Sequence, residues 1–86
     1  MPNVTLEQDA ALELGELPKP IKSRMAELLA RLADWPNVSG AKPLTGNLAG
    51  HYRLRTGDYR LQFRIEARQV VVERIGHRDG FYDEDE

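Results

Sequence analysis

Arginines are concentrated in one segment of this 86-residue sequence, and their type and spacing are the first feature that points to chemistry. Seven arginines and no lysine lie between residues 51 and 78, against three acidic residues, which gives this segment a charge of +4. A guanidinium group is planar and donates hydrogen bonds in pairs, so a group of arginines suits phosphate. A solvated sheet face, balanced by acids elsewhere, is the alternative interpretation of the same composition.

Four of these arginines alternate with apolar residues along two segments, 52–55 and 59–65, as expected of strands. Neighbouring side chains of a strand point to opposite faces, so these four are expected together on the uncovered face of a sheet. Like charges on adjacent strands repel by a few tenths of a kcal/mol or more per pair. Their clustering therefore predicts that a polyanion binds there. The four are Arg53, Arg55, Arg60 and Arg64.

The end of the arginine-rich segment adds His77, Arg78 and Tyr82. Arginine can hold a phosphate and its developing charge, histidine or tyrosine can transfer a proton, and an aromatic ring can stack on a base. Together these groups could cleave RNA without a metal, with the 2′-hydroxyl of the RNA as the attacking group. The two histidines, at positions 51 and 77, lack metal-ligand spacing and the chain has no cysteine, so we predict no metal site and no cofactor.

Two helices are expected ahead of these strands. Apolar residues recur at three- and four-residue spacing over 7–16 and again over 20–34, where Ile21, Met25 and Leu28 begin a clear apolar stripe. Prolines at positions 18, 20 and 36 mark the ends of these helices. A short strand over 4–6 can precede the first helix, and residues 37–50, rich in glycine, proline and asparagine, are predicted to be a loop.

Three strands are expected after this loop, at 52–55, 59–65 and 69–75, joined by turns at 56–58 and 66–68 into an antiparallel meander. The last strand alternates poorly, which predicts that it is covered on both faces. Helices followed by strands are typical of an α+β domain, here a helical hairpin packed on the apolar face of a small sheet. The length allows one domain, which we assign to residues 1–82, with an acidic tail at 83–86.

The overall composition fits a globular chain, with 41% hydrophobic and 30% charged residues and a formal net charge of −2. Five acids among the last eight residues offset the basic segment. The sequence has no apolar run long enough to cross a bilayer and no signal-peptide pattern at its start, so we expect a cytoplasmic protein without membrane contact.

Nearly the whole chain resembles the RelE/ParE superfamily of bacterial type II toxins, and most closely its RelE-like ribonuclease branch. The resemblance rests on Leu17-Pro18 between the helices, on residues 42–46 (KPLTG), on residues 50–60 (GHYRLRTGDYR), and on residues 75–78 (IGHR) with Tyr82 four residues later. It implies a RelE-like fold and a toxin that cleaves mRNA, usually on the ribosome. It also implies a co-encoded antitoxin that silences the toxin in a hetero-oligomer.

The resemblance also implies roles for individual residues. Basic residues and a terminal tyrosine carry the activity of the family's ribonucleases, and the matching positions are Arg53, Arg60, Arg78 and Tyr82. Three further residues lie beside them and are predicted to bind RNA, namely Arg55, Arg64 and His77.

Two departures from the family pattern keep alternatives open. The chain is slightly acidic whereas family members are usually basic, and Asp79 stands where many relatives have another base. The alternatives are a non-catalytic, ParE-like toxin that poisons a topoisomerase and an inactive relative retained for its contact with an antitoxin.

Overall fold

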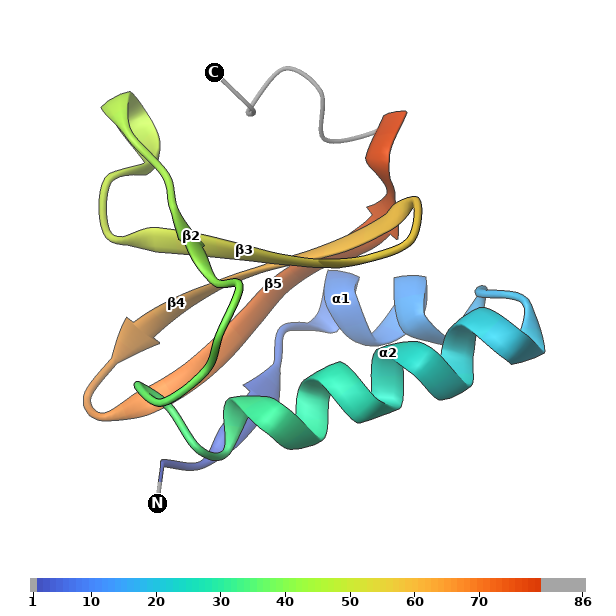
Figure 1. The fold of residues 1–86 in the computed structure, drawn as a ribbon, viewed down its shortest axis with the longest axis horizontal. Coiled ribbons are helices and arrows are strands. Elements are labelled where there is room, and N and C mark those ends of the chain that lie inside the picture. The colour runs from blue at the N-terminus through green and yellow to red at the C-terminus, as the bar shows by residue number, and fades with distance from the viewer. Residues whose placement is uncertain (1, 80–86) are drawn as a thin grey trace.

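The computed structural model describes residues 2–79, which form one mixed sheet with two α-helices on one side (Figure 1). The strands lie across the sheet in the order β1-β5-β4-β3-β2, with β1 parallel to β5 and all other neighbours antiparallel. The predicted α+β class is confirmed. The elements in chain order are β1 (Val4–Leu6), α1 (Gln8–Gly15), α2 (Lys19–Leu32), β2 (Lys42–Pro43), the 3-10 helix η1 (Gly46–Leu48), β3 (His51–Thr56), β4 (Tyr59–Glu66) and β5 (Gln69–His77).

The sheet has five strands, so the three-stranded meander describes its centre but not its edges. At one edge β1 pairs with β5, bringing Val4 opposite Val70. At the other edge β2 pairs with β3, with Lys42 opposite Arg53, so residues 37–50 are not entirely loop. Both edge strands are very short, and their formation depends on distant partners or on an adjoining hairpin rather than on a local apolar pattern.

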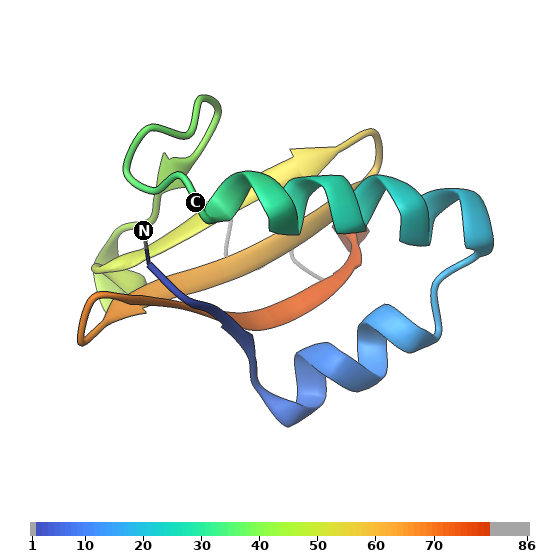
Figure 2. The same cartoon turned by 90° about the horizontal axis from the view of Figure 1, so that it is seen from below.

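Both helices lie on the same side of the sheet, as the view from below shows (Figure 2). α1 packs against β5, and α2 runs along β3. The apolar stripe of α2 predicted from the sequence is confirmed, because Met25 and Leu32 are fully buried against the sheet. After α2, the Trp35 ring makes edge-on contacts with the rings of Tyr52 at 4.8 Å and Phe63 at 5.2 Å between centroids. These contacts join the end of the helical layer to the centre of the sheet.

A β-bulge explains the irregular pattern of β5. Gln62 lies opposite Arg74 whereas the next residue, Phe63, lies opposite Val72, which leaves Glu73 as the extra residue. The core side of β5 therefore holds Val70, Val72 and Ile75, all buried. The prediction that β5 is covered on both faces is wrong, because its alternation is interrupted by the bulge and not by a second apolar layer.

The β3–β4 connection is the tight hairpin turn predicted at 56–58, with Gly57 at a φ of +59°, where glycine is favoured. Within residues 2–79, no helix combines the length and the apolar character needed to cross a membrane.

Candidate nucleic-acid interface

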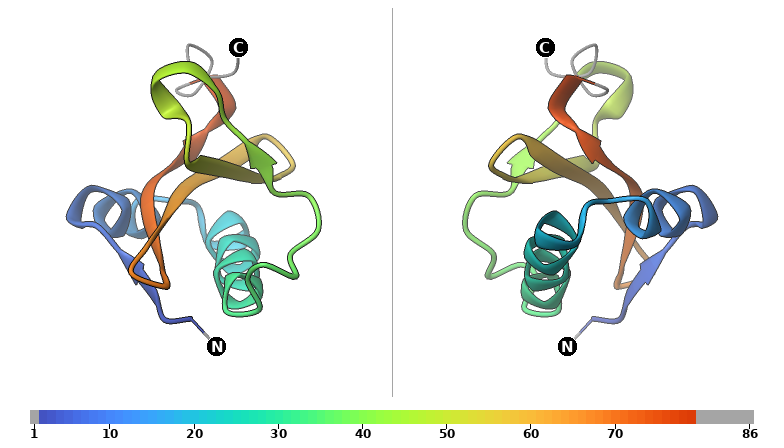
Figure 3. Two further views of the ribbon diagram at one scale, coloured as in Figure 1. Left: turned by 90° about the vertical axis from the view of Figure 1, so that its left-hand side faces the viewer. Right: turned by 90° about the vertical axis from the view of Figure 1, so that its right-hand side faces the viewer.

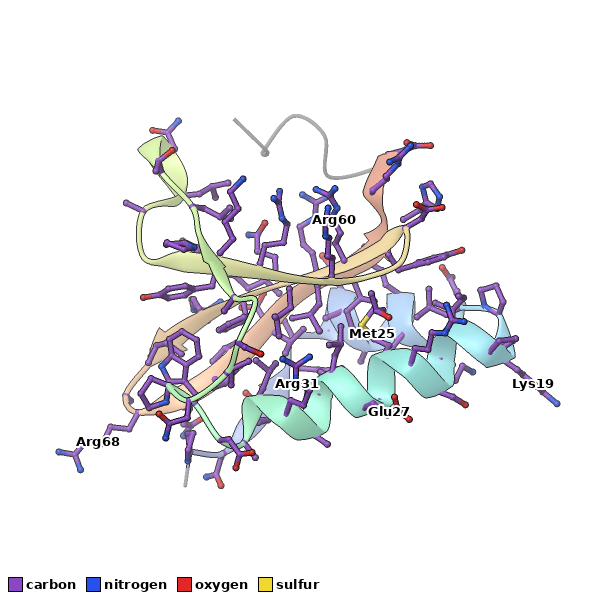
Figure 4. All side chains as sticks on the ribbon, in the orientation of Figure 1. Lys19, Met25, Glu27, Arg31, Arg60 and Arg68 are labelled. Carbon is purple, nitrogen blue, oxygen red and sulfur yellow. The ribbon has the colours of Figure 1, made fainter. Side chains whose placement is uncertain are left out.

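The side of the sheet opposite the helices carries the arginines, and we call it the arginine face. Arg60 points away from the helical layer (Figure 4). Arg55 lies directly opposite Arg60 across β3 and β4, and Arg53 lies opposite Gln62 one step along the strands. The strand alignment thus brings Arg53, Arg55 and Arg60 together. Arg74 of β5 joins them, because it lies opposite Gln62 from the other side.

The arginine face is not uncovered, contrary to the prediction from the sequence. Arg53 and Arg60 are only 7% and 8% exposed, whereas Arg55 is exposed. The segment around η1 rises above the sheet on one side and residues 77–79 rise on the other, so the face has raised borders (Figures 1 and 3). A guanidinium group that has lost part of its hydration attracts a phosphate more strongly than one in open water.

A cavity of about 250 Å³ opens at the β2 edge of the arginine face and is lined by Gly40, Lys42, Arg53, Leu54 and Arg55. Three of the five lining residues are cationic, which suits an anion such as a phosphate group. Sequence reasoning gave Lys42 no role, because it lies in the segment predicted to be a loop. Its pairing with Arg53 is what brings it to this site.

Glu73, the extra residue of the bulge, is the centre of a polar cluster on the same face. Its carboxylate interacts with His51 Nδ1 at 2.7 Å, Gln62 Nε2 at 3.0 Å and Arg64 Nη1 at 2.9 Å. Burial opposes ionisation of Glu73, but hydrogen bonds from Gln62, His51 and Arg64 outweigh this effect and lower its pKa. Sequence reasoning missed this cluster, because a bulge leaves no local signal.

Arg64 is compensated by carboxylates of the protein itself. Besides Glu73, it donates to Glu7 at 2.7 Å and to Glu66 at 2.8 Å. Hydrogen bonds with Glu7, Glu73 and Glu66 together raise the pKa of Arg64. Three carboxylates of the described residues therefore compensate the charge of Arg64, and RNA binding by Arg64 stays a prediction.

The predicted residues at the end of β5 lie at the border of the face. The His77 ring packs edge-on against Tyr59, 5.2 Å away between centroids, and the backbone N–H of Asp79 donates to His77 Nδ1 at 3.2 Å. The backbone N–H of Arg78 donates to the Asp58 carbonyl at 2.7 Å, which fixes the border to the β3–β4 turn. The roles predicted for His77 and Arg78 stay predictions.

Tyr82 and the acidic residues 83–86 lie outside the described residues. Across residues 2–79, no three histidine, aspartate or glutamate side chains gather in a way that could hold a metal ion.

Comparisons with known proteins agree with one another. A family model described as the ParE toxin of the type II toxin-antitoxin system parDE matches residues 4–80. The toxin RelG of Mycobacterium tuberculosis is 35% identical over 75 residues, which cover 85% of this chain and 86% of RelG.

Solved structures give the same result. The RelBE2 toxin-antitoxin complex of Mycobacterium tuberculosis contains a chain similar to this one, with a TM-score of 0.78 and 33% identity over 90% of this chain and 99% of that chain. The isolated RelE toxin of E. coli has a similar fold, with a TM-score of 0.76 and 16% identity over 90% of this chain and 84% of RelE.

Proposed function

Because the chain belongs to the RelE/ParE superfamily of type II toxin-antitoxin toxins, we propose that it is a metal-independent endoribonuclease that cleaves mRNA, on the ribosome as the RelE-like branch does. The observation that carries this proposal is the concentration of guanidinium groups on one bordered face, with Arg55 and Arg60 directly opposite each other and Arg53 beside a cationic cavity.

In the proposed reaction, the 2′-hydroxyl of one nucleotide attacks the adjacent phosphorus. A bond from the 2′-oxygen to phosphorus forms, the bond to the 5′-oxygen of the next nucleotide breaks, and the products are a cyclic phosphate and a 5′-hydroxyl. Arg53 and Arg60 stabilise the negative charge that develops on the phosphate oxygens. The attacking hydroxyl loses a proton and the leaving oxygen gains one, and the candidates for these proton transfers are His77 and Tyr82, with Arg78 as a further phosphate-binding group.

We also propose that a cognate antitoxin binds this toxin and silences it. The support is that the similar chain in RelBE2 was solved in a toxin-antitoxin complex. An antitoxin with acidic side chains would complement the arginine face and so compete with RNA for it.

A second candidate function follows from the comparisons. The matching family model is described as the ParE toxin, which supports the alternative left open by the resemblance, a ParE-like toxin without ribonuclease activity that poisons a topoisomerase. The number of clustered guanidinium groups on the arginine face favours the ribonuclease.

Induced expression with primer extension on cellular messages tests the proposal. We expect the wild-type chain to stop growth and to produce discrete cuts within translated messages. The Arg60→Gln variant removes one buried guanidinium and should lower cleavage by about 100-fold or more, as loss of one charge-stabilising donor does elsewhere. Arg68→Gln is the matched control, because Arg68 lies exposed in the β4–β5 turn, far from Arg60 (Figure 4). Growth arrest with intact messages and broken DNA would replace the ribonuclease by the second candidate.

A further inference from the structure

Gln62 lies in the middle of the arginine face and has an incomplete set of hydrogen bonds. It stands opposite Arg53 of β3 on one side and Arg74 of β5 on the other. Only 5% of the residue is exposed. Its Nε2 donates to Glu73 Oε1 at 3.0 Å, but its Oε1 is buried and has no hydrogen-bond partner within residues 2–79. Buried polar atoms are nearly always hydrogen-bonded, so this acceptor requires an explanation.

Glu73 determines which end of the Gln62 amide, the NH2 group or the carbonyl oxygen, is left without a hydrogen-bond partner among the described residues. An ionised carboxylate can only accept hydrogen bonds, and the lowered pKa of Glu73 keeps it ionised at neutral pH. The amide must therefore turn its NH2 group toward Glu73, and the carbonyl oxygen points elsewhere. Glu73 is itself held by His51 at 2.7 Å and Arg64 at 2.9 Å, so the amide has a rigid support. Gln62 Oε1 is thus a hydrogen-bond acceptor with a fixed orientation, between the cationic residues Arg53 and Arg74.

The chemistry of RNA limits which group can satisfy this acceptor. Phosphate oxygens cannot donate a hydrogen bond at neutral pH, so they suit the arginines and not Oε1. The ribose lies between consecutive phosphates along the backbone, and its 2′-hydroxyl is a donor. A chain whose phosphates are held by Arg53 and Arg74 would place a ribose over Gln62, whereas base edges lie farther from the backbone.

We propose that Gln62 Oε1 accepts a hydrogen bond from a ribose 2′-hydroxyl of bound RNA, and that this contact lets the arginine face distinguish RNA from DNA. The inference rests on the proposed ribonuclease function and adds a specificity-determining residue to it. Gln62 lies between Arg53 and Arg74 across the strands and is buried, so the contact requires these two side chains to shift toward phosphates and expose the Gln62 amide. Glu73 is then a positioning residue, which acts on RNA through Gln62.

Binding of chemically altered strands tests this inference. The probe is one single-stranded oligonucleotide sequence in two forms, all-ribose and all-2′-fluoro, because fluorine replaces the hydroxyl but cannot donate a hydrogen bond. Fluorescence anisotropy is measured with the Arg60→Gln chain, in which cleavage should be suppressed. We expect the ribose form to bind about fivefold more tightly, the ratio typical of one net hydrogen bond. Gln62→Met in this background should bind both forms equally, with its affinity for the 2′-fluoro form unchanged.

The control and the alternative outcomes keep this inference separate from the proposed function. Gln69→Leu, which removes another glutamine from the far end of β5, should keep the fivefold preference. If the Arg60→Gln chain binds both forms tightly and equally, or if Gln62→Met keeps the preference, the inference is wrong while RNA binding stands. If neither form binds, and the wild-type chain does not bind the 2′-fluoro form, which it cannot cleave, the proposed ribonuclease function fails together with the inference.

Discussion

Replacing Glu73 by alanine should destabilise the fold, because it removes the centre of the polar cluster on the arginine face. Within residues 2–79, three side chains interact with this carboxylate, and they differ in which other partners remain to them once it is removed. Arg64 keeps Glu7 and Glu66, and the His51 side chain is 26% exposed and can turn to water. Gln62 is 5% exposed, so its Nε2 would be left buried without a partner.

The expected loss of stability follows from the one donor, Gln62 Nε2, that loses its hydrogen-bond partner. An unsatisfied buried polar group costs about 1–3 kcal/mol, and we expect Glu73→Ala to lower the free energy of unfolding by about 2 kcal/mol at pH 7. For a domain of this size, such a loss should lower Tm by about 8–16 °C.

The difference between wild type and Glu73→Ala should also depend on pH. The pKa of Glu73 is lowered in the folded state from its ordinary value of 4.5, so the folded chain binds fewer protons than the unfolded chain near that pH. The contribution of Glu73 is therefore fully present above about pH 5 and is lost as the pH falls below 4.5 through the folded-state pKa. The free-energy difference between the two proteins should narrow over this range.

Urea unfolding followed by fluorescence of Trp35, the single tryptophan, measures this difference, because its ring packs on Tyr52 and Phe63. Glu66→Ala is the matched control. Glu66 also accepts from Arg64, at 2.8 Å, but its side chain is 62% exposed, so its loss should cost under about 1 kcal/mol. Equal losses for the two variants, or a difference that stays constant down to acidic pH, would refute the argument.

Three further predictions concern the cationic cavity, the hairpin turn and the core. Lys42→Gln should weaken RNA binding and reduce the slope of log K against log salt concentration by about 0.7, the value for one phosphate contact on a single strand. Lys22→Gln, on the exposed side of α2, should change neither the affinity nor the slope. Gly57→Ala should cost about 1–2 kcal/mol in urea unfolding, since φ is +59° there; an unchanged midpoint would contradict this. Phe63→Ala should cost about 3–5 kcal/mol and alter Trp35 fluorescence in the folded state; a loss below 1 kcal/mol would contradict the packing described.

The elements that could be predicted from the sequence are those whose pattern is local. The stripe of α2 has a helical period of its own, and the β3–β4 hairpin combines period-two alternation with Gly57 at the turn. Placing Arg53, Arg55 and Arg60 on one face required only this alternation and the turn between the strands.

The features that could not be predicted depend on register or on distant segments. The bulge at Glu73 appears only when β5 is aligned with β4, and it converts a residue of a β-branched run into the centre of a polar cluster. Arg53 and Arg60 look exposed in the sequence, because alternation says nothing about the borders of a face. In the sequence, Gln62 is only a polar residue of an alternating strand, and nothing there indicates that Glu73 orients its amide.

The parallel pairing of β1 with β5 has a consequence for synthesis of the chain. The residues of β1 are synthesised early, yet their partners in β5 begin at Val70, so this edge of the sheet cannot form until almost all of the described chain has been made. Until then, α1 lacks its partner β5 and α2 has only the β3–β4 hairpin to cover, so part of the apolar stripe around Met25 stays exposed to water. A chain interrupted before β5 would expose part of this stripe to proteases instead of folding, so we expect interrupted translation to leave no folded fragment of the chain in the cell.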